Sequence, residues 1–314
     1  MKKLIFSVIA VAAVVCACSV RGERSSEFVR VENGQFVRGE DTLSFVGTNY
    51  WYGPLTASEG RGGNRERLHK ELDALKSIGV TNLRILVGSD GPEGVAYKVE
   101  PVLQLEPGVY NDTVLRGLDY LLAQMAERDM HAVLYFNHSW EWSGGYGQYL
   151  EWAGNGRALL PSVDGYENYV DHVSRFVKDE KAKELYYNHV KNIVTRTNTV
   201  TGKPYTEDPT IFSWQIGNEP RAFARDSVTK AAFADWMCTS ASLIKSLDPN
   251  HMVSSGSEGL YGCEVDMDLF EKIHAHEDFD YLNVHIWPLV WRWVTKDTFA
   301  DSVCVANRMT EKYL

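Results

Sequence analysis

The segment PTIFSWQIGNEPR, Pro209–Arg221, holds the residue whose type and position best suit chemistry. Its apolar run, residues 211–216, is typical of a buried strand, and the tetrapeptide Gly217–Pro220 follows at once. Because proline cannot continue a strand ladder, Glu219 is expected at the carboxyl end of that strand. Hydrolysis of a glycoside needs one carboxyl group to protonate the leaving oxygen and a second to act on the anomeric carbon. Glu219 could be the first of these if burial or a second carboxylate raises its pKa.

An isolated Asn-Glu-Pro sequence would be interpreted as a turn without chemistry. Here it follows a strand-like run, and in parallel barrels the carboxyl ends of the strands carry the catalytic groups. We therefore favour a catalytic position for Glu219. The preceding residue, Asn218, is placed to donate a hydrogen bond to a sugar hydroxyl.

The tryptophans point to a carbohydrate ligand. Aromatic faces stack on the C–H surfaces of sugars, and seven of the nine tryptophans fall just after predicted strands. The other two, Trp214 and Trp236, are expected in the core. The seven candidates for a sugar-binding rim are Trp51, Trp140, Trp142, Trp152, Trp287, Trp291 and Trp293.

An alternation of strands and helices must position these residues. Short β-rich runs predict strands at Leu43–Asn49, Asn82–Val87, Ala132–Asn137, Ile211–Gly217, Met252–Ser257 and Tyr281–Ile286. Amphipathic patterns predict helices at Arg65–Ile78, Val114–Arg128, Ala182–Arg196 and Lys230–Ser246, with a further helical pattern near Thr298–Leu314.

This alternation predicts a parallel sheet. Six strands are compatible with a doubly wound sheet and also with part of an eight-unit barrel, which usually needs about 250 residues. The motifs favour the barrel. We find no internal repeat and no low-complexity linker.

Five segments resemble the retaining (β/α)8 glycosidases, and in particular glycoside hydrolase family 5 and its endo-β-1,4-mannanase branch. The segment Pro209–Arg221 is similar to the fourth strand of that clan and is its most specific feature. The other segments are similar, in order, to the first, second, third and sixth strands or the loops after them: FVGTNYWYG (Phe45–Gly53), NLRILVG (Asn82–Gly88), FNHSWEWSGGYGQYLEWAG (Phe136–Gly154) and VHIWPLVW (Val284–Trp291).

This resemblance implies a (β/α)8 TIM barrel and a retaining endo-acting hydrolase. Glu219 would be its acid/base residue, and β-mannan or a related plant polysaccharide its substrate. The reaction requires no cofactor and no metal.

The resemblance also suggests which residues bind substrate. Arg84 matches an arginine near the nucleophile, and His285 and Trp287 match a His-x-aromatic pair. Trp51 and His138 are expected to contact sugar. From the residues alone, Arg84 could instead form a structural ion pair and His285 could be a satisfied core histidine, but their positions at predicted strands favour roles in the cleft.

One part of the family pattern has no match. The family's nucleophile is a Glu at the end of strand seven, and strand eight carries a Trp. We therefore expect the nucleophile to be missing from this chain, and the barrel domain, residues 28–314, to be incomplete at its C-terminus with roughly six of eight β/α units. Glu311 lies in helical sequence, and Glu258 is expected to support the cleft.

Two alternative functions remain open at this point. A β-1,4-glucanase of the same family would share these motifs. A non-catalytic, surface-exposed glycan-binding protein would explain an intact aromatic rim without a nucleophile.

Composition excludes other classes. The net charge of −10 and the lack of a basic stripe argue against a nucleic-acid partner. There is no Gly-rich phosphate loop and no Ser–His–Asp signature. The run His274–Glu277 lacks further ligands at metal spacing, so we interpret it as a solvated surface segment. Oligomeric state is not predicted.

The N-terminus reads as an export signal. A basic start and an apolar run precede Cys18, which follows the small residue Ala17, so residues 1–18 are expected to be a lipoprotein signal peptide with Cys18 lipidated. Cys16 is the competing site. Residues 19–27 would be a flexible tether, and the protein would be anchored to the bacterial cell envelope only through lipid, or secreted.

Three further cysteines leave an odd count, so they cannot all pair internally. Cys238 and Cys263 could form a disulfide in an exported protein, and buried free thiols are the other possibility. No pairing is predicted for Cys304.

Overall fold

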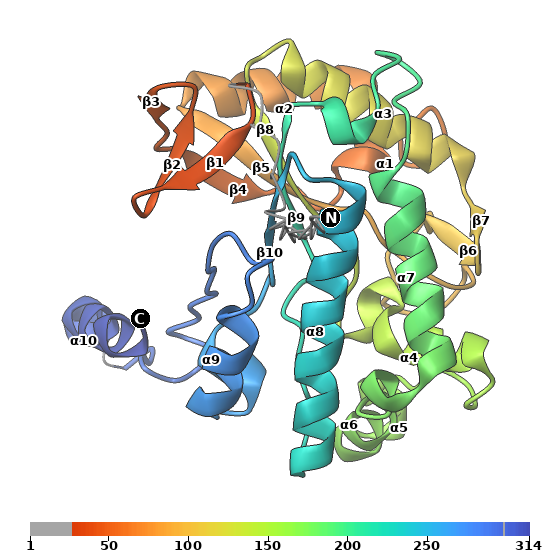
Figure 1. The fold of residues 1–314 in the computed structure, drawn as a ribbon, viewed down its shortest axis with the longest axis vertical. Helices are drawn as coiled ribbons and strands as arrows, with labels where there is room; N and C mark the ends of the chain where they lie inside the picture. Colours follow the sequence, from red (N-terminus) through yellow and green to blue (C-terminus); the bar gives the residue numbers. More distant parts are fainter. Residues whose placement is uncertain (1–26, 298) are drawn as a thin grey trace, which may run out of the picture.

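A five-stranded parallel sheet lies at the centre of the molecule (Figure 1). The computed structural model describes residues 27–297 and 299–314. All four pairings in the sheet are parallel, so the carboxyl ends of the strands meet at one edge. In spatial order the strands are β10 (Met252–Ser254), β9 (Ile211–Gln215), β8 (His131–Tyr135), β5 (Val80–Leu86) and β4 (Val46–Asn49).

Five helices occupy the segments predicted to be helical, which confirms those predictions. Four of them begin at an Asn or Asp whose side chain accepts a backbone N–H, a cap that contributes about 1 kcal/mol each. The five are α2 (Arg65–Ser77), α3 (Asp112–Ala126), α7 (Glu180–Val194), α8 (Ser227–Leu247) and α10 (Phe299–Tyr313). Shorter helices that were not predicted are α1 (Gly53–Ala57), α4 (Gly145–Ala153), α5 (Pro161–Asp164), α6 (Tyr166–Val173) and α9 (Met267–His274).

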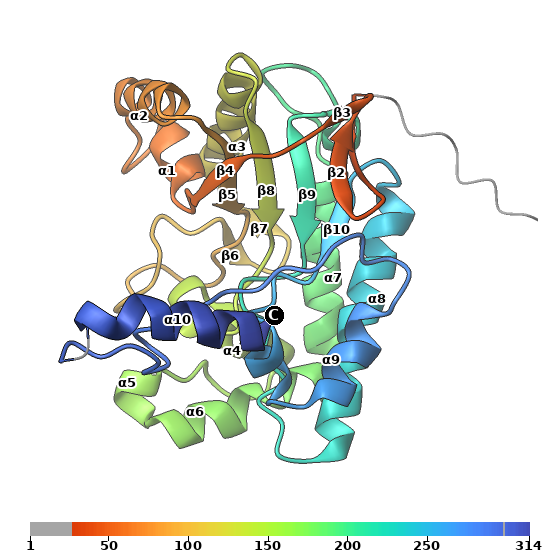
Figure 2. The ribbon, with the colours of Figure 1, turned by 90° about the vertical axis from the view of Figure 1, so that its left-hand side faces the viewer.

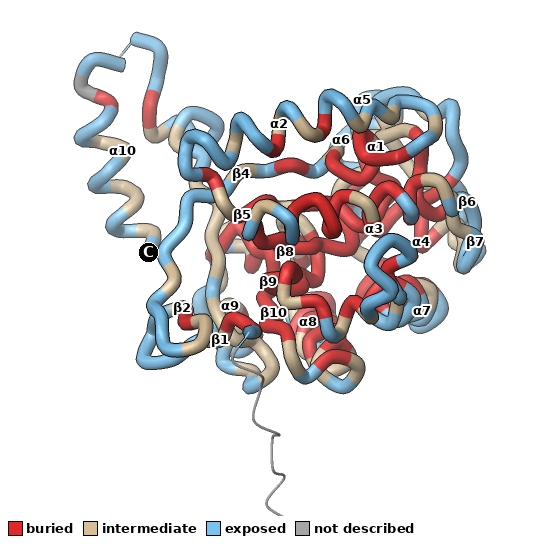
Figure 3. Tube along the Cα trace, turned by 90° about the horizontal axis from the view of Figure 1, so that it is seen from above, coloured by how far each residue is buried: buried red, intermediate tan, exposed pale blue. Residues whose placement is uncertain are grey.

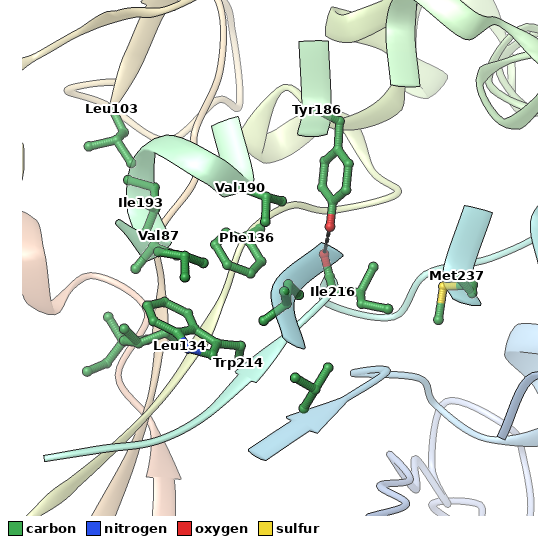
Figure 4. Close-up of a cluster of buried hydrophobic side chains, with 14 of the residues drawn as sticks. Val87, Leu103, Leu134, Phe136, Tyr186, Val190, Ile193, Trp214, Ile216 and Met237 are labelled. Atoms are coloured by element: carbon green, nitrogen blue, oxygen red, sulfur yellow. Dashed lines mark hydrogen bonds between the residues drawn. The ribbon is translucent and has the colours of Figure 1, made fainter. Parts of the chain in front are cut away.

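The main hydrophobic core lies between the sheet and the helices. Leu134 and Trp214 point from the sheet into this layer, where they meet Val190 and Ile193 of α7 (Figure 4). The hydroxyl of Tyr186 donates to the carbonyl of Ile216 at 2.9 Å, which satisfies a buried carbonyl beyond the end of β9. Buried residues follow the strands and the inner helix faces, whereas α10 lies apart from them and carries mostly exposed and half-buried residues (Figure 3).

A small antiparallel sheet precedes the parallel one and was missed in the sequence. It consists of β1 (Val29–Glu32), β2 (Gln35–Arg38) and β3 (Asp41–Thr42). Asn33 and Gly34 connect β1 and β2 with φ of 51° and 76°, and such an Asn-Gly pair is a strong hairpin signal.

This small sheet packs against the amino ends of the parallel strands (Figure 2). Phe36 lies edge-on to Phe212 and to Tyr281, with ring centroids 5.1 and 5.2 Å away. These aromatic rings fill the end of the sheet opposite to its carboxyl edge.

The sixth predicted strand, Tyr281–Ile286, is not a strand in the structure. The segment runs beside β10, but it pairs with that strand largely through side chains. The backbone N–H groups of Val253 and Gly256 donate to the side chains of Asp280 and Asn283, at 2.7 and 2.9 Å. A side-chain acceptor replaces the carbonyl that a ladder would use, so no regular register forms. The described part of the chain therefore has five parallel strands and not six.

Some predictions fall outside the described residues. The signal peptide, the lipidation site Cys18 and nearly all of the tether lie there and stay predictions. None of the helices in the described part is both long and apolar enough to cross a membrane. All three of Cys238, Cys263 and Cys304 are free thiols, and Cys263 is buried.

Candidate active site

Glu219 lies just beyond β9, on the carboxyl edge of the sheet, as predicted. Its backbone is left-handed, with φ of 51°, a region that residues other than glycine rarely occupy. Its N–H donates to the carbonyl of Gly256 at 2.9 Å, and its own carbonyl accepts from the hydroxyl of Ser139 at 2.9 Å. Only glycine fits at position 256, because a Cβ there would lie 1.8 Å from the carbonyl oxygen of Gly217. The turn that carries Glu219 is therefore held from both sides.

The carboxyl group of Glu219 accepts two hydrogen bonds from the predicted His-x-aromatic pair. Nδ1 of His285 lies 2.8 Å from Oε1, and Nε1 of Trp287 donates to the same oxygen at 3.1 Å. Because an ionised carboxylate can only accept, Nδ1 of His285 carries the proton. The structure thus places His285 and Trp287 at the carboxyl group.

The hydrogen bonds and charges around Glu219 set the direction in which its pKa is shifted. Burial raises it, but the hydrogen bonds from His285 and Trp287 and the charges of His285 and Arg84 outweigh burial. The pKa of this carboxyl therefore lies below its ordinary value. A pKa raised by burial or by a second carboxylate, which an acid near neutral pH needs, is not produced by the described residues, because polar donors surround the buried group.

Arg84 connects the second and fourth strand ends. Its Nε donates to Oε1 of Gln215 at 2.7 Å, and its Nη1 donates to Oδ1 of Asn218 at 2.5 Å. The guanidinium also lies 4.2 Å from the ring centroid of Tyr135. The pKa of Arg84 is lowered overall, because burial outweighs the nearby tyrosines and Glu219, which raise it. Among the described residues, Arg84 is thus hydrogen-bonded to side-chain amides and forms no ion pair.

His138 continues this chain of hydrogen bonds. Since Oδ1 of Asn218 accepts from Arg84, its Nδ2 donates to Nε2 of His138 at 2.8 Å. The proton of His138 is then on Nδ1, which is buried and lacks a hydrogen-bond partner among the described residues. Burial, followed by the charges of Arg84 and His285, holds the pKa of His138 well below its ordinary value, so the imidazole is neutral. A neutral, buried imidazole thus ends the chain of hydrogen bonds that begins at Arg84.

These side chains surround a cavity of about 600 Å³. The structure brings together all six predicted substrate-contacting residues around Glu219. It adds Asn49 and Tyr135, which sequence reasoning missed, although Asn49 ends a predicted strand and Tyr135 lies two residues before the end of another. The lining residues are Asn49, Trp51, Arg84, Tyr135, His138, Trp140, Trp142, Asn218, Glu219, His285, Ile286 and Trp287.

The seven candidate rim tryptophans divide into two groups. Trp51, Trp140, Trp142 and Trp287 line the cavity. The remaining three do not: Trp152 packs against the main core, and Trp291 and Trp293 pack on each other and on Tyr313. A position just after a predicted strand therefore assigned three tryptophans too many to the sugar-binding rim. Trp214 and Trp236 are buried, as expected.

Glu258 and Glu311 are two further carboxylates, which the sequence places after a predicted strand and in the C-terminal segment. Glu258 is buried and accepts a hydrogen bond from Nε of Arg221 at 2.5 Å, so it supports the loop that follows Glu219. Glu311 lies on α10 and is exposed. Among the described residues that line the cavity, Glu219 is the only carboxylate.

Comparison with known proteins gives a consistent result. Residues 26–314 match glycoside hydrolase family 5, β-mannosidase-like. Mannan endo-1,4-beta-mannosidase 1 of Arabidopsis thaliana is 29% identical over 293 residues, covering 87% of this chain and 66% of the relative. Putative mannan endo-1,4-beta-mannosidase 9 of Oryza sativa subsp. japonica is 31% identical over 285 residues, covering 85% and 64%. This chain thus spans less than two thirds of the length of these relatives.

A solved structure is also similar. The glycoside hydrolase family 5 mannosidase from Rhizomucor miehei matches with a TM-score of 0.81 at 33% identity, covering 91% of this chain and 68% of the other. A variant of that enzyme, solved in complex with mannosyl-fructose, matches with a TM-score of 0.80. Together with the alternation of parallel strands and helices, this likeness confirms the predicted (β/α)8 barrel class.

Proposed function

The chain belongs to glycoside hydrolase family 5, in its β-mannosidase-like group, and on that basis we propose that it serves to hydrolyse β-1,4-mannosidic links in mannan-type glycans. The proposed reaction proceeds with retention of configuration, and Glu219 is the acid/base residue. The proposed cleavage is at internal links of the glycan, as the names of the plant relatives describe for those proteins.

The observation that carries this proposal is the environment of Glu219. Its carboxyl group lies in a cavity walled by Trp51, Trp142 and Trp287, on which sugar rings can stack. Glu219 is thus the only carboxylate among the described residues that face a sugar-binding surface.

In the first step Glu219 gives its proton to the leaving glycosidic oxygen as the C–O bond breaks, and the nucleophilic carboxylate that retention requires bonds to the anomeric carbon. It then removes a proton from the water that releases the product. One Nδ2 hydrogen of Asn218 is used by His138, which leaves the second hydrogen for a sugar hydroxyl.

Retention also requires a nucleophilic carboxylate about 5 Å from the acid. The described cavity supplies Glu219 alone, so the nucleophile is not assigned to a residue here. A carboxylate at that distance would raise the pKa of Glu219 by charge repulsion. The proton that Glu219 must donate would then be retained closer to neutral pH.

The test compares Glu219→Gln with Glu141→Gln on soluble mannan, by release of reducing sugar. Glu141 is a half-buried carboxylate in the same region that does not line the cavity, so it is the matched control. We expect Glu219→Gln to lose about 10²- to 10⁴-fold in rate and Glu141→Gln to keep the parent rate. Equal rates of sugar release for the parent, Glu219→Gln and Glu141→Gln would refute the role of Glu219. Binding of mannan without any release of reducing sugar by the parent would favour a non-catalytic glycan-binding protein.

A second candidate is an enzyme that removes single mannose units from short glycans. It is favoured by the β-mannosidase-like group that matches and by the likeness to the Rhizomucor miehei mannosidase. The product pattern from mannohexaose distinguishes the two. Internal cleavage gives di- to tetrasaccharides early, whereas terminal cleavage gives mannose from the start.

A further inference from the structure

β8 and β9 remain paired beyond their last regular residues. The N–H of Asn218 donates to the carbonyl of Asn137 at 2.8 Å, and His138 and Asn218 form a parallel bridge. The two strands therefore reach the active site in register.

Proline interrupts the next step of this ladder. In a parallel pair the next donor toward the β8 side would be the N–H of residue 220, and its acceptor would be the carbonyl of Ser139. Pro220 has no N–H. The carbonyl of Ser139 accepts instead from the hydroxyl of Tyr169, at 2.7 Å.

The hydroxyl of Ser139 takes over the connection to the other strand. It donates to the carbonyl of Glu219 at 2.9 Å and accepts from the N–H of Arg221 at 3.0 Å. One side chain thus bridges the residues on either side of Pro220. Ser139 is only 1% exposed, so water does not readily replace these two bonds.

The bridged turn needs such support. The left-handed backbone of Glu219 is unfavourable for a residue with a side chain, and it persists only where neighbours fix it. Arg221 is anchored in turn, because its Nε donates to Glu258 at 2.5 Å. Loss of the hydroxyl bridge would leave the backbone of Glu219 held by its N–H bond to Gly256 alone, so the turn would constrain the carboxyl group less tightly toward His285 and Trp287.

We propose that Ser139 is a positioning residue, whose hydroxyl replaces the ladder step lost at Pro220 and holds the carboxyl group of Glu219 against His285 and Trp287. The inference rests on the proposed function only in giving Glu219 a catalytic role. The geometric claim can be tested without substrate.

The experiment follows the indole N–H signal of Trp287 in the ¹⁵N-labelled full chain as pH is varied. That N–H donates to Glu219, so its signal should report the protonation of the carboxyl group. The signal is identified by its loss in Trp287→Phe. In the parent we expect a midpoint below the ordinary pKa of glutamate.

In Ser139→Ala we expect the midpoint to rise by roughly half a unit to one unit, because the carboxyl group loses donors that favour its charged form. Ser139→Thr, which keeps a hydroxyl, should restore the parent midpoint. Ser143→Ala is the matched control, since Ser143 is buried in the same loop and its hydroxyl has no partner among the described residues. It should titrate like the parent.

If Ser139→Ala does not fold, Ser139→Cys serves in its place, because a thiol fills the site but is a weak donor. It should raise the midpoint in the same direction. A parent-like midpoint in the folded Ser139 variant, or an equal rise in Ser143→Ala, would overturn the proposal. Hydrolysis is not part of this readout, so failure of the proposed function, seen with Glu219→Gln, remains distinguishable from failure of the positioning role.

Discussion

Nδ1 of His285 lies 2.8 Å from Oε1 of Glu219, although the segment that carries His285 belongs to no strand of the sheet. The side chains of Asp280 and Asn283 hold this segment along β10. An irregular connection thereby positions a donor as closely as a strand would. The protonation behaviour of Glu219 depends on that donor and on Trp287.

Trp287→Phe should raise the pKa of Glu219, because the indole N–H bond that favours the carboxylate is lost while the apolar surface is kept. For an acid catalyst, a higher pKa moves the high-pH limb of the kcat/KM profile to higher pH. The measurement is that profile for the parent and the variant on a soluble mannan oligosaccharide. A limb that stays in place or moves to lower pH would contradict the assigned hydrogen bond.

Trp51→Ala should weaken binding of mannopentaose by roughly tenfold, because an exposed aromatic wall of the cavity is removed. The affinity is measured by titration calorimetry in the Glu219→Gln background, in which the ligand stays intact. Trp291→Ala is the control, because Trp291 packs on Tyr261 and Tyr313 and does not line the cavity. Equal losses in both variants would mean that the cavity is not the sugar site.

Asp248→Asn should lower the free energy of unfolding by about 1–3 kcal/mol at pH 7, since it leaves a buried donor unsatisfied. The fully buried carboxylate accepts from Nε1 of Trp214 at 2.8 Å and from His251 at 2.6 Å. Burial raises the pKa of Asp248, but these hydrogen bonds and the charge of His251 outweigh burial and lower it.

The pH dependence of this effect follows from the direction in which folding shifts the pKa of Asp248, which is downward. A group whose folded pKa is depressed stabilises above its unfolded pKa, and that stabilisation is lost as pH falls through the folded value. Urea unfolding at pH 7 and pH 3 should therefore show a smaller difference between parent and variant at pH 3. The exposed Asp235→Asn is the control and should show little change at either pH.

Cys18→Ala should abolish incorporation of labelled fatty acid and move the full chain from the membrane fraction to the soluble fraction of a Gram-negative host. The prediction rests on the signal peptide expected from the sequence and on the small residue before Cys18. Cys16→Ala is the matched control and should keep the label. Loss of the label in Cys16→Ala instead would assign the lipid to the other cysteine.

Hydrophobic periodicity was sufficient to find most of the frame of the sheet. β5, β8 and β9 are short apolar runs, and α2, α3, α7 and α8 are amphipathic, so each pattern has a direct physical cause in burial. The segment Tyr281–Ile286 has the same apolar pattern and yet forms no ladder, because Asp280 and Asn283 occupy the hydrogen-bonding positions beside β10. Local sequence does not reveal what a neighbouring strand will bond to.

The site was predictable where it followed from strand ends. Glu219, Arg84 and His138 lie at one edge because parallel strands end together. The lowered pKa of Glu219 was not predictable, since it depends on donors more than sixty residues away in sequence. Ser139 was also missed, because its importance appears only when Pro220 is found opposite its carbonyl.

The aromatic rings at the amino ends of the strands have a consequence for how a polymer can enter. The rings of Phe36, Phe212 and Tyr281 pack together at that end of the sheet. Under the proposed function, a glycan would reach the described cavity from the opposite, carboxyl edge of the sheet, because these rings occupy its amino end. Phe36 and Phe212 do not line that cavity, so substitutions there should act mainly on stability, whereas Tyr281 lies close enough to Arg84 to influence its pKa.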